Sequence, residues 1–170
     1  IADVESMKPK GNANQNIYTE GKLDFDAFGV GKKLCHELKE ITDSTNNTFI
    51  SWKYDGTDCN WNHWGINWNG WYQANFRGIE NKSELRFKVK TINNSKFKIK
   101  LEDFRYHSSE LNSSTFLTSN QSEWTQISIP LSKFNLSEKG FVMDQIRQLT
   151  FVAEGKGEVF IDDIEIVEIK

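Results

Sequence analysis

The chain has 170 residues, which fits one ordinary domain that buries about 70% of its unfolded surface and needs no disulfide or metal merely to fold. Its 21 Lys and Arg residues against 24 Asp and Glu give a net charge of −3, a mildly acidic balance that argues against a nucleic-acid-binding protein. A mean hydropathy of −0.62, without an apolar run of about 18 residues, excludes a membrane-spanning helix, and the 13% aromatic content excludes a disordered chain.

The beginning of the chain predicts how it is organised. Residues 1–16 are polar and lack hydrophobic periodicity, so we expect a linker or flexible N-terminal segment there and a single module over 17–170. The chain starts with Ile1 and shows no apolar signal segment. This start favours a mature fragment, or a module cut from a longer protein that is secreted or exposed at the cell surface.

From residue 48 onward, apolar and polar residues alternate with the period of two that half-buried strands show. The segments 84–90 and 97–102, with turn residues between them, predict an antiparallel hairpin with one buried face. So many short strands in one domain predict an all-β fold, a jelly-roll β-sandwich of two antiparallel sheets. The predicted strands are 48–54, 64–68, 84–90, 97–102, 124–129, 148–153 and 158–161.

Five of the six tryptophans fall between residues 52 and 71, interleaved with Asn and Gln. An indole ring covers the apolar C–H face of a pyranose sugar, and neighbouring amides bond its hydroxyl groups. The mixture favours a partly wet sugar-binding groove, and the alternative is that several of these rings fill the core. The candidate carbohydrate-binding residues are Trp52, Tyr54, Trp61, Trp64, Trp68, Trp71, Tyr72, Gln73 and Asn75.

Within this cluster, Asn69-Gly70 predicts a two-residue hairpin turn, because both residue types tolerate positive φ angles. In that register Trp68 lies opposite Trp71, and Trp64 shares their face, so the three indoles form an exposed sugar platform. Two alternatives stay open. Residues 69–76 form a loop that places Trp71 at the rim of the groove, or the Trp68–Trp71 pair only holds the hairpin together.

Catalytic and metal-binding patterns are weaker. A glycosidase needs two facing carboxyl groups, one with a raised pKa, but Glu84 and Glu102 alternate with lysines as on a solvated strand face. We therefore expect no enzyme; the rival interpretations are a small jelly-roll glycoside hydrolase and a protein-interaction jelly roll.

Cys35 and Cys59 form one disulfide in an oxidising compartment, or are two small buried apolar residues. Oxygen ligands for calcium, with solvated acids as the alternative, are Asp24, Asp26, Asp43, Asp162 and Asp163.

Four segments carry a family resemblance: 85–89 with 97–103, then 123–134, 144–151 and 157–164. The most specific parts are the Trp-x-x-Ile-x-Ile-Pro strand that starts at Trp124 and the Ile-Asp-Asp-Ile run that starts at Ile161. In this order the segments resemble the galactose-binding-like jelly-roll carbohydrate-binding modules, particularly families 11, 4 and 22.

This resemblance implies a noncatalytic module appended to a larger glycoside hydrolase, with an open groove on its concave sheet. It also implies a structural calcium ion held by Asp26 near the first strand and by Asp162 in the closing strand. Together with the tryptophan cluster, it leads us to expect a monomer that binds neutral β-linked glucan chains such as mixed-linkage glucan, xyloglucan or amorphous cellulose, with neither nucleic acid nor membrane as a partner.

Overall fold

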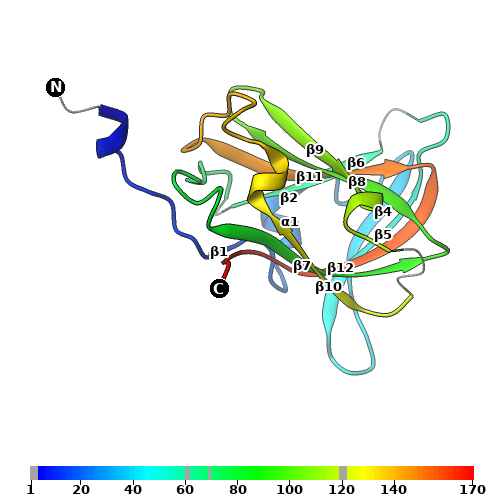
Figure 1. Ribbon diagram of the computed structural model, residues 1–170. Coiled ribbons are helices and arrows are strands. Elements are labelled where there is room, and N and C mark those ends of the chain that lie inside the picture. Colours follow the sequence, from blue (N-terminus) through cyan, green and yellow to red (C-terminus); the bar gives the residue numbers. More distant parts are fainter. Residues whose placement is uncertain (1–3, 60–61, 69, 119–121) are drawn as a thin grey trace.

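Two antiparallel sheets packed face to face make up the protein (Figure 1). The structure is a computed structural model that describes residues 4–59, 62–68, 70–118 and 122–170. The predicted all-β sandwich is confirmed. In the described part of the chain, no helix has the length and apolar content needed to cross a bilayer.

The larger sheet contains seven strands among the described residues, in the order β10-β7-β12-β5-β4-β3, with β1 paired to the second half of β12. Its long strands β7 and β12 bury alternate side chains and expose the others. The strands are β1 (Gln15–Asn16), β3 (Gly31–Lys32), β4 (His36–Thr42), β5 (Thr48–Asp55), β7 (Ser83–Ile92), β10 (Thr125–Pro130) and β12 (Lys156–Glu168).

The smaller sheet has five strands within the described ranges, in the order β2-β6-β11-β8-β9. These are β2 (Ala27–Phe28), β6 (His63–Asn67), β8 (Lys96–Asp103), β9 (Ser108–Asn112) and β11 (Ile146–Glu154). A helical turn, η1 (Val4–Met7), precedes the first strand. Three others lie between strands: α1 (Leu23–Asp26), η2 (Ser113–Thr115) and η3 (Leu131–Phe134).

The predicted pairing of segments 84–90 and 97–102 is wrong, although both are strands. They are β7 and β8, and they belong to opposite sheets. The connection at Asn93 and Asn94, both with positive φ, carries the chain across the sandwich. Each strand has one apolar face, and these faces meet across the core instead of lying side by side in one sheet. The same crossing recurs at Gly155, between β11 and β12.

Aromatic rings form the centre of the core. Trp52 of β5 and Trp64 of β6 are both fully buried, and their ring centroids lie 6.1 Å apart across the two sheets. Trp64 also stacks on Phe151 of β11, with centroids 4.4 Å apart. Burying such large rings contributes strongly to the hydrophobic stabilisation of the sandwich.

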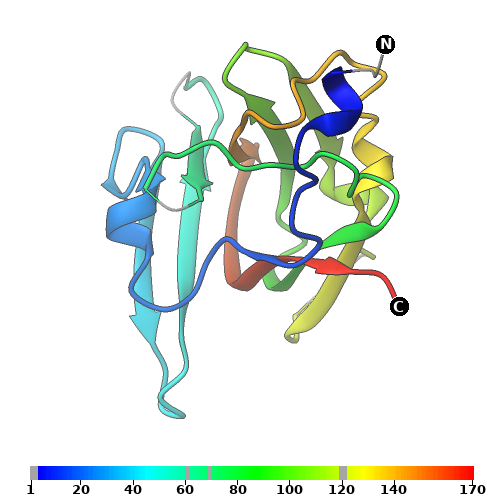
Figure 2. The same ribbon diagram turned by 90° about the vertical axis from the view of Figure 1, so that its left-hand side faces the viewer.

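The N-terminal segment joins the fold before residue 17. Gln15 and Asn16 pair with Ile166 and Glu165 of β12, and the Gly11 amide donates a hydrogen bond to the Arg77 carbonyl at 2.8 Å. Figure 2 shows this segment, in blue, beside the red end of β12. Ordered contacts therefore begin inside the range that we predicted to be a linker.

Cys35 and Cys59 form a disulfide, with their Cα atoms 6.1 Å apart. The bridge connects the residue just before β4 to the segment that follows β5. Of the two interpretations that the sequence left open, the structure contains the disulfide.

Candidate functional site

The structure separates the nine predicted site residues into two groups. Trp52, Tyr54, Trp64 and Trp68 lie in the core and are at most 2% exposed, because β5, β6 and the residue after β6 turn them toward the opposite sheet. The exposed platform predicted from Trp64 and Trp68 is therefore wrong. Trp61 lies outside the described residues. At the surface, in the segment that follows β6, lie Trp71, Tyr72, Gln73 and Asn75.

The hairpin predicted at Asn69-Gly70 is also wrong. Strand β6 ends at Asn67, and its two edges are already paired with β2 and β11, so no edge remains for a returning strand. The segment after Gly70 instead runs as a loop and makes a single bridge, from Ala74 to Ile146. Trp71 is 37% exposed and Tyr72 is 76% exposed in this loop. This is the loop alternative, with Trp71 at the surface.

Polar side chains gather on the outer face of the five-stranded sheet. Two rows cross it in register: Gly65, Thr150, Lys100 and Glu110 in one, and Asn67, Gln148, Glu102 and Ser108 in the next. These residues alternate with core residues along their strands, so their side chains point away from the other sheet. We name this surface the polar face and define it by His63, Lys100, Glu102, Gln148 and Thr150.

Glu102 is the centre of the polar face. Its Oε2 accepts hydrogen bonds from Gln148 Nε2 at 2.6 Å and from Thr150 Oγ1 at 2.5 Å, and its Oε1 lies 3.5 Å from Lys100 Nζ. Burial alone raises the pKa of Glu102, but these hydrogen bonds and the Lys100 charge outweigh it and hold the pKa below its ordinary value. Glu102 is therefore an ionised acceptor. Among the residues that the structure describes, Gln148 Oε1 has no hydrogen-bond partner, although Gln148 is only 7% exposed.

An aromatic cluster borders the polar face. The Phe28 ring lies over Gly65, where a Cβ atom would come within 2.4 Å of its Cε1, so glycine is needed for this close approach. Phe28 packs edge-on against His63 at 5.8 Å between centroids and tilted against Trp71 at 6.2 Å. Burial and the nearby Lys100 charge lower the pKa of His63, which keeps its imidazole neutral at pH 7.

Asn67 and Asp26 hold the loop that carries Trp71. The buried Asn67 side chain accepts a hydrogen bond from the Trp71 amide at 2.6 Å and donates one to the Asp26 carbonyl. Asp26 Oδ1 accepts the Gly70 amide at 2.9 Å. These contacts fix the turn after β6, so that Trp71 reaches the edge of the polar face.

Asp26 and Asp162, the predicted calcium ligands, differ in how well they fit that role. The Asp26 carboxylate already accepts the Gly70 amide through Oδ1, so part of its capacity is used by the fold. Asp162 is 4% exposed, and burial together with the Asp163 carboxylate raises its pKa, so a bound cation would relieve an unfavourable buried charge. Over the described ranges, no three His, Cys, Asp or Glu side chains come together to hold a metal.

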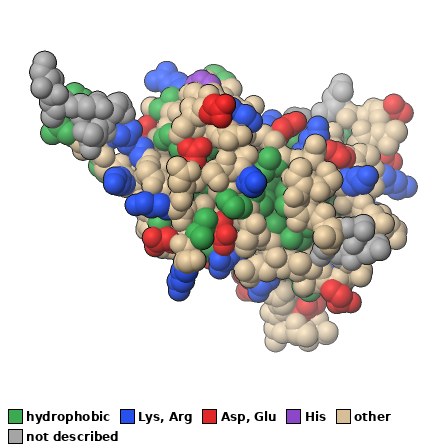
Figure 3. Space-filling model, in the orientation of Figure 1, with side chains coloured by type: hydrophobic (Ala, Val, Ile, Leu, Met, Phe, Trp, Pro, Cys, Tyr) green, Lys and Arg blue, Asp and Glu red, His purple; other side chains and the backbone are tan. Residues whose placement is uncertain are grey.

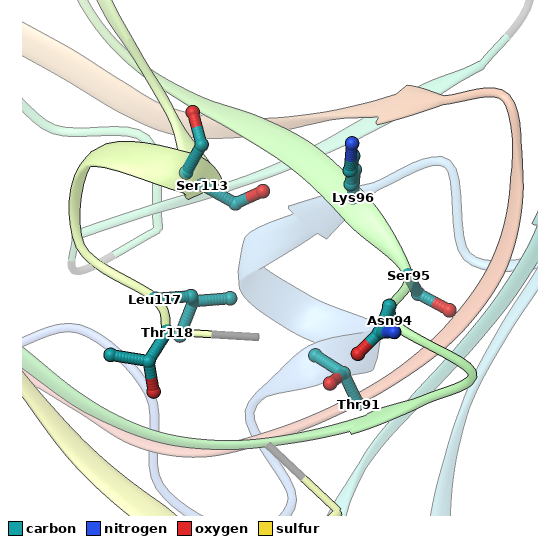
Figure 4. Close-up of a pocket in the computed structure, with 8 residues that line it drawn as sticks. Thr91, Asn94, Ser95, Lys96, Ser113, Leu117 and Thr118 are labelled. Carbon is teal, nitrogen blue, oxygen red and sulfur yellow. The ribbon is translucent and has the colours of Figure 1, made fainter. Parts of the chain in front are cut away.

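A cavity of about 380 Å³ lies elsewhere, between the β7–β8 connection and η2 (Figure 4). Its serines serve the fold: Ser95 Oγ accepts the Glu158 amide at 2.8 Å, and Ser113 Oγ accepts the Phe97 amide at 3.1 Å. None of the eight predicted residues that the structure describes lines this cavity. It has no contact with the aromatic cluster that would make it a sugar site.

Comparison with known proteins identifies the family. The model of carbohydrate binding domain 30 matches residues 11–168. The chain belongs to this family. No curated protein sequence matches this module.

Solved structures agree with the family in fold. The module is similar to the family 30 carbohydrate-binding module of the cellulosomal cellulase Cel9D-Cel44B of Clostridium thermocellum, with 16% identity, a TM-score of 0.63 and coverage of 95% of this chain and 94% of that one. It is also similar to a family 11 module from the same organism in complex with a β-1,3-1,4-mixed-linked tetrasaccharide, with 16% identity, a TM-score of 0.58 and coverage of 94% and 97%. The predicted resemblance to jelly-roll carbohydrate-binding modules is confirmed, and the protein is a noncatalytic glycan-binding module by family.

The sequence reasoning missed most of the polar face. Gln148, Thr150 and Phe28 were not candidates, and Glu102 was assigned to a solvated strand face. Strand alternation does place Lys100 and Glu102 on one side of 97–102 and Gln148 and Thr150 on one side of 148–153. What the sequence lacks is the pairing of β8 with β11, which brings the two pairs together.

Proposed function

We propose that the module binds a chain of β-linked glucose across the polar face, with Phe28 and Trp71 covering sugar rings and the Glu102 group bonding their hydroxyls. The observation that carries this proposal is the aromatic cluster of Phe28, His63 and Trp71, which lies beside Gly65 of β6. Gly65 and Asn67 of that strand pair with Thr150 and Gln148, which hold the Glu102 carboxylate. Apolar rings beside fixed donors and acceptors match a pyranose, which has an apolar face and a rim of hydroxyl groups.

Two further features support a neutral, hydroxylated ligand. Gln148 Oε1 is a buried acceptor without a partner in the described part of the chain, and a ligand hydroxyl is a donor that would satisfy it. Figure 3 shows Lys and Arg side chains dispersed among Asp and Glu on one side of the molecule, without a large area of one charge. The family 11 neighbour was solved with a β-1,3-1,4-mixed-linked tetrasaccharide, which supports mixed-linkage glucan as a ligand. Xyloglucan and amorphous cellulose are the other β-linked glucans that we propose.

The proposed role is binding without cleavage. A glycosidase acid needs a raised pKa, whereas the pKa of Glu102 is lowered, and Glu110, in the adjacent row, lies 3.5 Å from Lys98 Nζ. A reducing-sugar assay on the isolated chain is expected to detect no release of sugar from any β-glucan. We further propose that the module is a monomer, that it works outside the cell, and that it targets an attached glycoside hydrolase to polysaccharide.

The test of the binding site uses two variants and a matched control. Trp71→Ala removes a sugar-covering ring and is expected to weaken β-glucan binding about tenfold or more, a loss of about 1.4 kcal/mol for each factor of ten. Glu102→Gln removes a charged acceptor and is expected to weaken binding about three- to tenfold. The control is Trp124→Ala, because Trp124 is a half-buried indole packed against Phe49 of the seven-stranded sheet.

Isothermal titration with mixed-linkage glucan, xyloglucan and cello-oligosaccharides measures these affinities, and thermal melting confirms that each variant is folded. Binding should change little with salt, because the ligand is neutral. If both variants bind like the parent while Trp124→Ala loses affinity, the ligand lies on the other sheet and the proposal is wrong.

A further inference from the structure

A second polar cavity lies where the N-terminal segment passes the loop after β6. It has a volume of about 350 Å³, and it shares none of the side chains that define the polar face. We name it the amide crevice, because six of its lining residues are amides: Asn12, Asn14, Gln15, Asn16, Gln73 and Asn75. Lys22, Ala74 and Trp68 complete its lining.

Hydrogen bonds fix the walls of the amide crevice. Gln15 Nε2 donates to the carbonyls of Asn12, at 2.7 Å, and Asn75, at 3.0 Å, which ties the N-terminal segment to the loop. Asn75 Oδ1 accepts the Arg77 amide at 2.9 Å, and Asn14 Oδ1 accepts the Glu168 amide at 3.1 Å. The crevice is therefore held open by contacts among three separate segments of the chain.

Other groups in the crevice are not used by the fold. Within the described residues, the side chains of Asn16, Lys22 and Gln73 make no hydrogen bond and no ion pair, although each lines the cavity. Trp68 is 2% exposed and its indole Nε1 has no hydrogen-bond partner. Trp52 and Trp64 share this lack of a partner, but neither of them lines the crevice. Amides and an ammonium group that the fold leaves unused are an arrangement that a ligand can complete.

The lining chemistry selects the class of ligand. Each amide offers both donors and an acceptor, which suits hydroxyl groups that also donate and accept. No carboxylate lines the crevice, and Lys22 repels cations, so a metal ion does not fit. One ammonium among six amides provides little charge for an anion. The volume lies near the lower limit of the range of about 300–1,000 Å³ found for small-molecule sites.

We propose that the amide crevice binds one neutral sugar unit, either the end of a polysaccharide chain or a side branch. The Trp68 ring forms its apolar wall, and Asn16, Lys22 and Gln73 bond the hydroxyls. This site is independent of the polar face and does not rest on the function proposed for it.

The test is an NMR titration of the ¹⁵N-labelled protein with free glucose, xylose and galactose. The Trp68 indole N–H and the side-chain amides of Gln73 and Asn75 report on the crevice, and a saturable shift of these signals at sugar concentrations up to about 100 mM is expected for a site of millimolar affinity. The Asn16→Ala and Lys22→Ala variants each remove one hydrogen-bonding group and are expected to weaken this binding about two- to tenfold.

Two controls separate the two sites. Gln126→Ala removes an exposed amide on β10 and is expected to leave the sugar titration unchanged. Glu102→Gln alters the polar face and is expected to weaken β-glucan binding but not the shift of Trp68. Asn16→Ala and Lys22→Ala are expected to weaken the shift of Trp68 but not β-glucan binding. The proposal is overturned if no sugar gives a saturable shift, if Asn16→Ala and Lys22→Ala together leave the shift unchanged, or if Glu102→Gln abolishes it.

Discussion

Gly65 offers a way to disturb the polar face without touching the core. In Gly65→Ala, the new Cβ would lie 2.4 Å from Phe28 Cε1, 2.8 Å from Cζ and 3.2 Å from the Leu149 carbonyl oxygen. Ordinary carbon–carbon contacts are about 3.5–4.0 Å, so the Phe28 ring has to move by about 1 Å or more. It can move, because β2 has only two residues and, in the described part of the chain, pairs only with β6.

The displaced ring loses its contacts with His63 and Trp71. An aromatic pair of this kind is worth about 0.5–1.5 kcal/mol, which corresponds to about a two- to tenfold loss of β-glucan affinity. The stability should change by about 1 kcal/mol or less, because alanine also reduces the conformational entropy of the unfolded chain. Isothermal titration measures the affinity, and thermal melting measures the stability.

A double-mutant cycle with Phe28→Ala tests whether Gly65→Ala acts through the Phe28 ring. If Gly65→Ala acts only through Phe28, the double variant binds no more weakly than Phe28→Ala alone, so the two single effects are not additive. Full additivity, or unchanged affinity in Gly65→Ala, would refute the reasoning that Phe28 is positioned by its contact with Gly65.

Three other predictions concern stability. Trp64→Ala leaves a cavity at the centre of the core and should lower the free energy of unfolding, measured with urea, by about 3–5 kcal/mol. A loss below about 1 kcal/mol would contradict the burial of Trp64. Burial raises the pKa of Asp103, but hydrogen bonds from the amides of Val142, His107 and Arg105 and from the His107 ring outweigh burial and lower this pKa. The Asp103 carboxylate therefore stabilises the fold at neutral pH, and this stabilisation disappears as the pH falls below about 4. In thermal melts from pH 7 to pH 2, Asp103→Asn should lower the stability at pH 7 and make the stability fall less steeply with decreasing pH. An unchanged pH dependence would contradict this. Since the pKa of Asp162 is raised, its ionised form destabilises the fold above its unfolded pKa, and Asp162→Asn should raise the melting temperature in chelator at pH 7. Calcium that binds only the native state should stabilise the parent by about 2.7 kcal/mol at a hundredfold excess over Kd and so raise its melting temperature, but it should not raise that of Asp162→Asn. An equal response of both proteins would exclude Asp162 as a ligand.

Strand alternation was sufficient to predict the all-β fold and most strands. It gave 84–90 and 97–102 correctly as strands because each buries every second residue. It did not show their partners, because a strand with one apolar face satisfies the pattern equally in a hairpin or in two facing sheets. Only the packing of both apolar faces into one core decides between these arrangements.

The binding site was harder to predict for a related reason. A large aromatic ring near amides has the same local sequence whether it meets a sugar or another ring. Trp64 and Trp71 lie seven residues apart in one cluster, yet Trp64 stacks on Phe151 while Trp71 borders the polar face. Their orientation depends on where β6 ends and on the Asn67 side chain that turns the chain there. Long-range pairing sets both features, and a single sequence does not reveal it.

The position of β12 has a consequence for how the module forms. This strand lies between β7 and β5, so β10-β7 and β5-β4-β3 are joined in one sheet only through it, and its second half also pairs with β1. During synthesis, residues 156–168 are among the last of the module to leave the ribosome. Until they do, the larger sheet exists as unconnected parts with open edges, which are prone to wrong pairing. We therefore expect this module to fold after its synthesis and in one cooperative step, as its first and last strands meet.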